Sequence, residues 1–177
     1  MKPIGPLMRE HRLIERMVKI LEKELIKIKK TGKIDTNLIL GGVDFFRIYA
    51  DRTHHGKEED ILFRELAKKE LSIEHKTIMN NLLEDHKFAR KTVGALAEEN
   101  VSFIRGNIES MKEIILNLEK LITLYPRHIY TEDKEFFYPI LEYFSKKEQD
   151  NMLQEFWEFE RNMIHEKYLK MVNDLEH

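Results

Sequence analysis

The sequence predicts an all-α protein, an up-down four-helix bundle with one additional amphipathic helix at its C-terminal end. Apolar residues recur at helical spacing along nearly the whole chain, and no segment shows the alternation expected of a strand. Charged residues make up 35% of the chain and hydrophobic residues 42%, with few glycines and prolines, a composition rich in helix formers. Because no proline-, glycine- or serine-rich linker divides the chain, we expect one domain over residues 1–177.

The first two helices follow from an apolar stripe and the residues that interrupt it. We expect the first helix to run from about Pro6 to Lys30 and to end at the Thr-Gly-Lys sequence that follows. Asp35 or Thr36 then supplies the N-cap of the second helix. That helix continues into the sequence HHGKEEDILF, where Gly56 marks a kink.

The third and fourth helices complete the bundle, which we expect to span about residues 6–144. Ser72 caps the third helix, which is predicted to end near Glu98. The fourth helix is predicted to begin at Asn100 or Ser102 and to end near residue 144. These lengths suit four antiparallel helices with short connections.

A fifth helix is predicted over about residues 146–175. The sequence SKKE at 145–148 forms a capping box, in which a serine and a glutamate satisfy each other's backbone N–H groups. Trp157 lies among phenylalanines on this helix. The helix either covers the bundle or offers a face for a homodimer, and we favour the cover.

Charge and composition exclude several classes of protein. The formal net charge of −2 gives no basic field that would attract nucleic acid or an anionic membrane. The chain has no cysteine, which removes disulfides, thiolate zinc sites and cysteine nucleophiles. There is no run of about 18 apolar residues, as a membrane span requires, and no signal peptide pattern. We therefore expect a cytoplasmic protein.

Histidines and carboxylates recur in a pattern that predicts a metal site. His55 is followed four positions later by Glu59, and His128 is followed four positions later by Glu132. Residues four apart lie on one face of a helix, so each pair can reach the same point. The first and third helices would add one histidine each. The predicted metal ligands are His11, His55, Glu59, His86, His128 and Glu132.

The spacing of these residues indicates a twofold internal repeat of a helix pair. His86 lies 75 residues after His11, and His128 lies 73 residues after His55. Four imidazoles and two carboxylates buried together would carry a large cost in free energy without a cation. Two divalent ions solve this if each ion takes two histidines and the carboxylates bridge them. Mixed nitrogen and carboxylate ligands suit iron, whereas manganese or zinc is less favoured.

These motifs resemble the hemerythrin-like, HHE cation-binding family over roughly residues 7–141. The resemblance rests on His11, the sequence HHGKEE at 54–59, His86 and the sequence HIYTEDKEFFYP from His128. It implies a hemerythrin-like bundle with two non-heme iron ions bridged by an oxo or hydroxo group. It also implies binding of dioxygen, nitric oxide or peroxide at an open iron position.

One position departs from the oxygen-carrying members of that family. They have a second histidine four residues after the histidine of the third helix, and Arg90 occupies that position here. The predicted set therefore has four histidines, two for each iron. It is similar to a subgroup associated with nitric oxide chemistry and the repair of iron centres, and the symmetric set argues against reversible dioxygen carriage.

Three functions remain open from the sequence. The favoured one is a binding or sensing protein, in which the two irons bind dioxygen, nitric oxide or iron itself without turnover. The second is an enzyme that reduces peroxide or nitric oxide, or that oxidises ferrous iron. The third is a purely structural bundle without metal. The sequence does not identify a redox partner or an oligomeric state.

Overall fold

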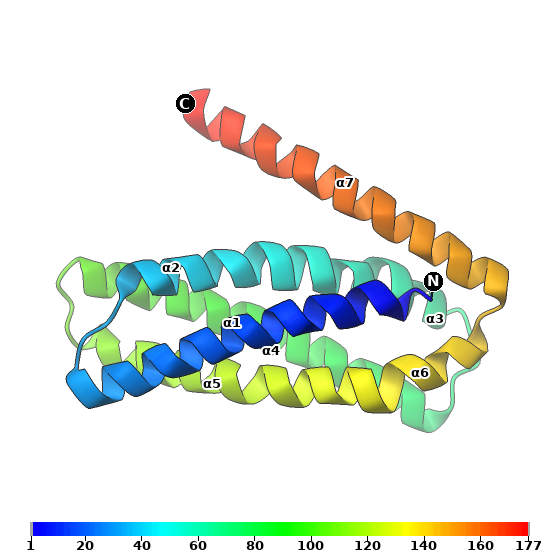
Figure 1. Cartoon of the computed structure of the whole chain (residues 1–177), viewed down its shortest axis with the longest axis horizontal. Coiled ribbons are helices and arrows are strands. Elements are labelled where there is room, and N and C mark those ends of the chain that lie inside the picture. Colours follow the sequence, from blue (N-terminus) through cyan, green and yellow to red (C-terminus); the bar gives the residue numbers. More distant parts are fainter. Residues whose placement is uncertain (1, 177) are drawn as a thin grey trace.

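The computed structural model describes the backbone of residues 2–176 and the side chains of residues 2–163, and this part of the chain contains helices but no strand. It confirms the all-α class and the four-helix bundle with an added C-terminal helix (Figure 1). The four rods of the bundle are α1 (Ile4–Thr31); α2 (Thr36–Phe45) with η1 (Phe46–His55), η2 (Glu58–Phe63) and α3 (Arg64–Leu66); α4 (Ile73–Ile104); and α5 (Ser110–Tyr130) with η3 (Thr131–Phe136), α6 (Phe137–Ile140) and η4 (Leu141–Tyr143).

The first connection forms as the capping residues predict. Gly32 ends α1 in the left-handed conformation, with a φ of 67°, and its N–H donates to the carbonyl of Ile28. Asp35 is the N-cap of α2, and its carboxylate accepts a hydrogen bond from the N–H of Leu38. The chain therefore reverses direction within a few residues.

The third helix is longer than the sequence predicts, since α4 passes Glu98 and ends at Ile104. The next helix was expected to begin at Asn100 or Ser102, but both residues lie within α4 and α5 begins at Ser110. Asn100 is fully buried, and its side-chain amide donates to the carbonyl of Thr36. The hydrogen bond ties α4 to the start of α2 and gives the side-chain NH2 group of Asn100 a partner inside the helix. The turn comes later, at Gly106, whose φ of 99° suits glycine.

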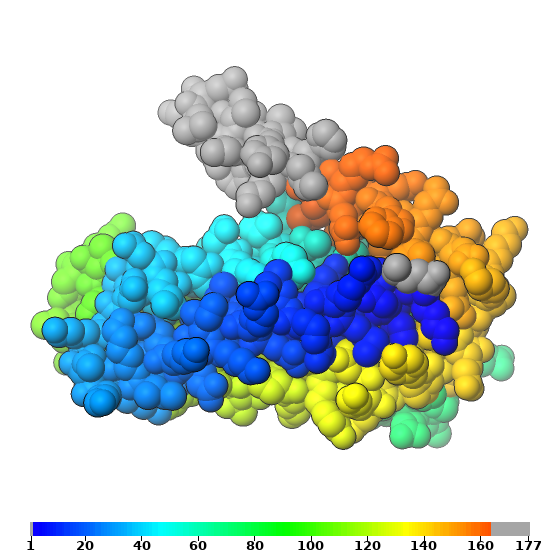
Figure 2. All heavy atoms as spheres, in the orientation of Figure 1, coloured from blue at the N-terminus to red at the C-terminus, as the bar shows by residue number. Residues whose placement is uncertain are grey.

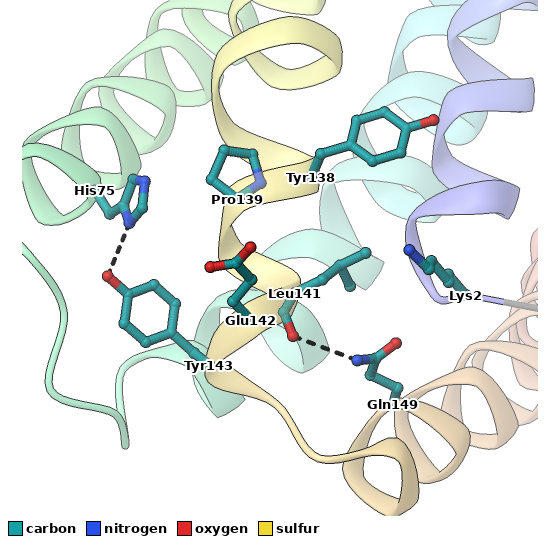
Figure 3. Close-up of a pocket in the computed structure, with 8 residues that line it drawn as sticks. All are labelled: Lys2, His75, Tyr138, Pro139, Leu141, Glu142, Tyr143 and Gln149. Atoms are coloured by element: carbon teal, nitrogen blue, oxygen red, sulfur yellow. Dashed lines mark hydrogen bonds between the residues drawn. The ribbon is translucent and has the colours of Figure 1, made fainter.

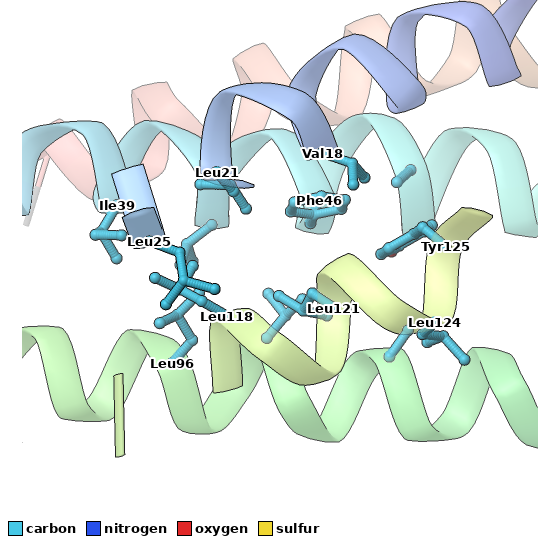
Figure 4. Packing of buried hydrophobic residues seen from close by; sticks show 14 of the residues in the cluster. Val18, Leu21, Leu25, Ile39, Phe46, Leu96, Leu118, Leu121, Leu124 and Tyr125 are labelled. Atoms are coloured by element: carbon cyan, nitrogen blue, oxygen red, sulfur yellow. The ribbon is translucent and has the colours of Figure 1, made fainter. Parts of the chain in front are cut away.

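Two apolar clusters fill the bundle. The cluster farther from α7 takes residues from all four rods, which point into a common interior in Figure 4. The cluster nearer α7 includes Leu7, Leu62, Leu82 and Phe136. Each cluster excludes water, so a polar layer between them lies in an apolar surrounding.

The C-terminal helix α7 (Lys146–Glu176) begins as predicted and packs on its own bundle. Ser145 and Glu148 form the capping box, in which each residue's backbone N–H donates to the other's side-chain oxygen. Met152 and Phe156 are buried in the nearer cluster. Figure 2 shows the first part of α7 against the rod that carries residues 46–66.

A surface pocket lies at the corner where α7 begins. It is lined by residues of α4, α6, η4 and α7, with Lys2 at its edge (Figure 3). The hydroxyl of Tyr143 lies 2.8 Å from Nδ1 of His75, and the side chain of Gln149 donates to the carbonyl of Leu141. These bonds fix the corner from which α7 starts.

Candidate metal centre

A layer of buried polar side chains crosses the bundle between the two apolar clusters. On α1, His11 lies between Leu7 of the nearer cluster and Ile14 of the farther one. On α4, His86 lies between Leu82 and Ala89 in the same way. The helical period places one such polar residue between two apolar layers on the inner face of a helix.

The polar layer contains two groups of side chains that could hold metal ions. One group is His11, His54, Glu58 and Glu132, and the other is His55, Glu58, His86 and His128. Within each group the ligand atoms all lie within 4.8 Å of one another. All seven side chains are at most 3% exposed. The two groups share Glu58, so they form one centre.

Wide helical turns bring several of these residues into the centre. His54, His55, Glu58 and Glu132 lie in the π-helical segments η1, η2 and η3. A π-helix has more residues per turn than an α-helix, so adjacent residues are separated by a smaller angle around the axis. His54 and His55 therefore both face the interior, where an α-helix would place them about 100° apart.

Each of the five histidines is oriented by a carboxylate. In every case Nδ1 faces a carboxylate oxygen, to which an Nδ1–H donates. The five pairs are His11 with Asp133 (2.7 Å), His54 with Glu10 (2.8 Å), His55 with Asp51 (3.3 Å), His86 with Glu59 (2.7 Å) and His128 with Asp85 (3.4 Å). This bond leaves the Nε2 lone pair available to a metal, an arrangement common among histidine ligands.

The inner nitrogens lie at distances that suit ligands of one ion. Nε2 of His11 lies 2.9 Å from Nε2 of His54, and Nε2 of His86 lies 3.2 Å from Nε2 of His128. Two imidazole nitrogens bound at right angles to one ion, each at about 2.1 Å, would be about 3.0 Å apart. Without a metal ion, a proton on one nitrogen of each pair must hold the two together as a hydrogen bond.

The two inner carboxylates each face both groups. Glu58 Oε1 lies 3.4 Å from His54 Nε2, and its Oε2 lies 3.5 Å from His86 Nε2. Glu132 Oε2 lies 3.1 Å from His11 Nε2, and its Oε1 lies 3.3 Å from His128 Nε2. Among the described side chains none makes a hydrogen bond to these four buried oxygens. Because burial of such oxygens without a partner is costly, they must bind either protons or a cation.

Outside the carboxylates that orient the histidines lies an outer layer of cations, the side chains of arginines and a lysine. Arg12 pairs with Asp133, Lys57 with Glu10, and Arg127 with Asp85. Arg90 pairs with both Asp51 and Glu59, at 2.6 Å each. Arg90 therefore points away from the centre, where two carboxylates compensate its charge.

Burial and neighbouring charges shift the pKa values of the inner groups. Burial and the adjacent Glu132 raise the pKa of Glu58 well above its usual range. Burial and the nearby His11 lower the pKa of His54 to about 4. Burial would also lower the pKa of His128, but Glu132 and Asp85 raise it to about 9. The metal-free centre therefore keeps protons that a metal ion would displace.

Five of the six predicted ligands come together in this centre, and Glu59 does not. His11, His55, His86, His128 and Glu132 belong to the two groups. Glu59 was expected to bridge the ions, but its side chain is 25% exposed and it bonds His86 Nδ1 and Arg90. The buried carboxylate common to both groups is instead that of Glu58, and His54 lies in the centre as a fifth histidine.

The sequence does contain a signal for the missed residues. In the second half of the repeat, His128 lies 42 residues after His86. In the first half, His54 lies 43 residues after His11 and His55 lies 44 residues after it, so His54 matches the spacing better. Both His54 and Glu58 lie 74 residues before their counterparts His128 and Glu132. The repeat therefore favours the pair His54 and Glu58 by one position.

Loss of the Arg90 charge is expected to weaken metal binding moderately. An Arg90→Gln variant leaves Asp51 and Glu59 without their shared cation, so the rings of His55 and His86 are held less firmly. Outer groups of this kind contribute about 10–100-fold to metal affinity, and we expect a loss of about tenfold. Competition with a chelator measures the affinity, and the exposed neighbour Lys91→Gln is the control. Equal affinities of the two variants would contradict this role of Arg90.

The fold and the buried histidines and carboxylates define a cation-binding helical bundle. The Hemerythrin HHE cation binding domain matches residues 2–140, and the chain belongs to that family. The matched region ends at Ile140, the last residue of α6, and leaves α7 outside it. Among curated proteins, none matches this chain. Within the described residues, no helix is both long and apolar enough to cross a membrane.

Proposed function

We propose that this chain holds two iron ions and binds a small diatomic ligand, dioxygen or nitric oxide, at them. His11 and His54 would hold one ion, and His55, His86 and His128 the other. Glu58 and Glu132 would bridge the pair, because each presents one oxygen to either group of histidines. When bound, the ions would supply an open coordination position and electrons for exchange with the ligand.

The unequal number of histidines is the observation that carries this proposal. Three histidines gather on one side of the bridging carboxylates and two on the other. With the carboxylates shared, protein groups fill one position fewer at the ion of His11 and His54. The four-histidine set predicted from the sequence would be symmetric and would leave no such difference. The fifth histidine removes the reason for doubting reversible binding.

Iron is the metal that these donors favour. Imidazole nitrogens and carboxylate oxygens suit iron, and the chain has no thiolate to favour zinc or copper(I). Manganese and zinc remain the alternatives in a metal analysis. The residues around the ions orient the ligands and exclude water. The His11 ring stacks on Phe137 at 5.7 Å between ring centres, and the His86 ring stacks on Phe63 at 6.2 Å.

Anaerobic purification with metal analysis and visible spectroscopy tests the proposal. We expect two irons per chain and an absorption band on adding dioxygen or nitric oxide that disappears when nitrogen removes the gas. Continuous consumption of peroxide with many turnovers would instead indicate an enzyme. A folded chain that takes up no metal would contradict the proposal and leave a structural role.

Metal uptake is expected to release protons at neutral pH. Because the pKa of His128 is about 9, this imidazole carries a proton at pH 7 in the metal-free chain and must lose it to bind an ion. We therefore expect about one proton per chain from His128 at pH 7 and almost none at pH 10. Metal affinity rises over the same interval. Titration in a weakly buffered solution measures the release, and a release that grows above pH 9 would contradict the assignment.

A further inference from the structure

One of the four cations in the outer layer differs from the others in its burial. The side chains of Arg12, Arg90 and Arg127 are 56%, 38% and 66% exposed. The side chain of Lys57 is 0% exposed. A fully buried ammonium group needs partners on every side, because an uncompensated buried charge is costly. The partners of Lys57 come from two directions.

Lys57 joins the metal centre to α7. Its Nζ donates to a carboxylate oxygen of Glu10, and the other oxygen of Glu10 accepts from His54 Nδ1 at 2.8 Å. The same Nζ donates to Glu160 of α7 at 2.5 Å and lies 5.7 Å from the centre of the Phe156 ring. A continuous line of contacts therefore runs from α7 to a ligand of the proposed metal ion.

The residue before Lys57 also fits α7 closely. A Cβ atom on Gly56 would lie 2.7 Å from Cζ of Phe159, closer than side chains approach one another. Glycine at this position lets the Phe159 ring rest on the backbone between His55 and Lys57. The helix segment that carries His54, His55 and Glu58 is thus in direct contact with α7.

The remaining contacts show that α7 has a docking face. Glu155 accepts from Arg64 at 2.7 Å, and Met152 and Phe156 are buried in the nearer apolar cluster. Together with Phe159 and Glu160, these residues recur at intervals of three and four along α7 and lie on one side of it. Figure 2 shows this part of α7 seated on the bundle.

We propose that α7 is a positioning element of the metal centre, in which Glu160 holds Lys57 against Glu10 and so orients His54. Metal loading and docking of α7 then strengthen each other. The inference rests on the proposed metal centre, and it assigns a role to a helix outside the matched family domain. Lys57 acts through Glu10 and touches no ion, so it is a positioning residue.

The coupling works in both directions. Undocking of α7 would expose Lys57 to water and free Glu10, so the His54 ring would lose its fixed orientation. Loss of the metal would replace the bonds between ion and ligands by protons and weaker hydrogen bonds, and the segment under α7 would relax. Because coupling between two sites is reciprocal, the effect of metal on α7 equals the effect of α7 on metal affinity.

Hydrogen exchange of the full chain, with and without bound ferrous iron under anaerobic conditions, tests this coupling. We expect removal of iron to raise the exchange rate of amides in residues 146–163 about fivefold or more. The far end of the bundle, at residues 110–118, shows how much of the change is a general loss of stability. If removal of iron raised the exchange rates of residues 146–163 and of residues 110–118 by the same factor, the change would be a general loss of stability and the proposal would be overturned.

A substitution on α7 separates coupling from simple stabilisation. In Glu160→Gln, iron should leave to a chelator about five times faster than in the unmodified chain, and α7 exchange should no longer depend on iron. Glu158→Gln is the matched control, since Glu158 is exposed on the same helix and, among the side chains of residues 2–163, accepts a hydrogen bond from Gln154 alone. Equal iron release in the two variants would overturn the role of Glu160.

The outcomes distinguish the two proposals. A chain that takes up no iron contradicts both the proposed function and this inference. A chain that takes up two irons but shows the same exchange in α7 with and without them contradicts the inference alone. Both readouts are independent of any reaction of the loaded protein.

Discussion

Replacing Glu58 with alanine is expected to abolish binding of both metal ions. Glu58 belongs to both groups of ligands and directs one oxygen to each, so its loss removes a ligand from each ion at once. The same result is expected for Glu132→Ala, because its two oxygens face His11 and His128. Metal analysis after gel filtration measures the stoichiometry, and circular dichroism verifies that the helices remain.

The adjacent residue supplies a matched control. Glu59→Ala removes a carboxylate of the same size one position along the chain, but this carboxylate only orients His86 and pairs with Arg90. We expect two ions per chain to remain, with an affinity reduced about 10–100-fold. If Glu58→Ala kept two ions while Glu59→Ala lost them, the bridging role would return to Glu59, as the sequence alone predicts.

The two adjacent histidines are expected to give different losses. His54→Ala leaves only His11 on one side of the carboxylates, so we expect that ion to be lost and the binding of dioxygen or nitric oxide with it. The affinity for that ion should fall by more than about 100-fold, the upper end of the loss seen when a residue that only orients a ligand is removed. His55→Ala leaves two histidines on each side, so we expect both ions to remain while reversible ligand binding is lost.

Iron content and gas-dependent spectra distinguish these variants. The expected stoichiometries are one iron per chain for His54→Ala and two for His55→Ala. His75→Ala is the control, because His75 contacts Tyr143 at the corner below α7, away from the centre. A His54→Ala protein with two irons and unchanged gas binding would show that His54 is not a ligand.

The helical fold was predictable because its signals are local. The apolar period, the cap at Asp35 and the capping box at Ser145 each act within one or two turns, and the structure has them in place. The boundary near Asn100 was wrong because asparagine is typical of turns, whereas here its side-chain NH2 group donates a tertiary hydrogen bond to Thr36 from inside α4. That bond depends on α2 lying beside α4, which local patterns do not contain.

Which residues form the candidate metal centre could be predicted from the sequence except for the choice between neighbouring positions in HHGKEE. The sequence HHGKEE offers two pairs four residues apart, and helical spacing accepts both. The choice between Glu58 and Glu59 depends on the wide turns of η1 and η2, which periodicity does not reveal. The orientation of Arg90 away from the centre likewise depends on its pairing with Asp51, a residue 39 positions away in the sequence.

The contacts between α7 and the residues around the candidate metal centre lay beyond sequence reasoning for a related reason. The capping box and apolar residues predicted a helix that covers the bundle. The contact of Glu160 with Lys57 joins residues 103 positions apart, and it becomes visible only when both helices are placed. Gly56, expected to mark a kink, also lies in close contact with Phe159, which the sequence did not predict.

Mössbauer spectroscopy of the oxidised, iron-loaded protein tests the central claim most directly. The unequal set of three and two histidines predicts two iron environments, and therefore two quadrupole doublets of equal area. A single doublet with two irons per chain would indicate the symmetric four-histidine centre. A spectrum from one iron per chain would contradict the bridging of two ions by Glu58 and Glu132.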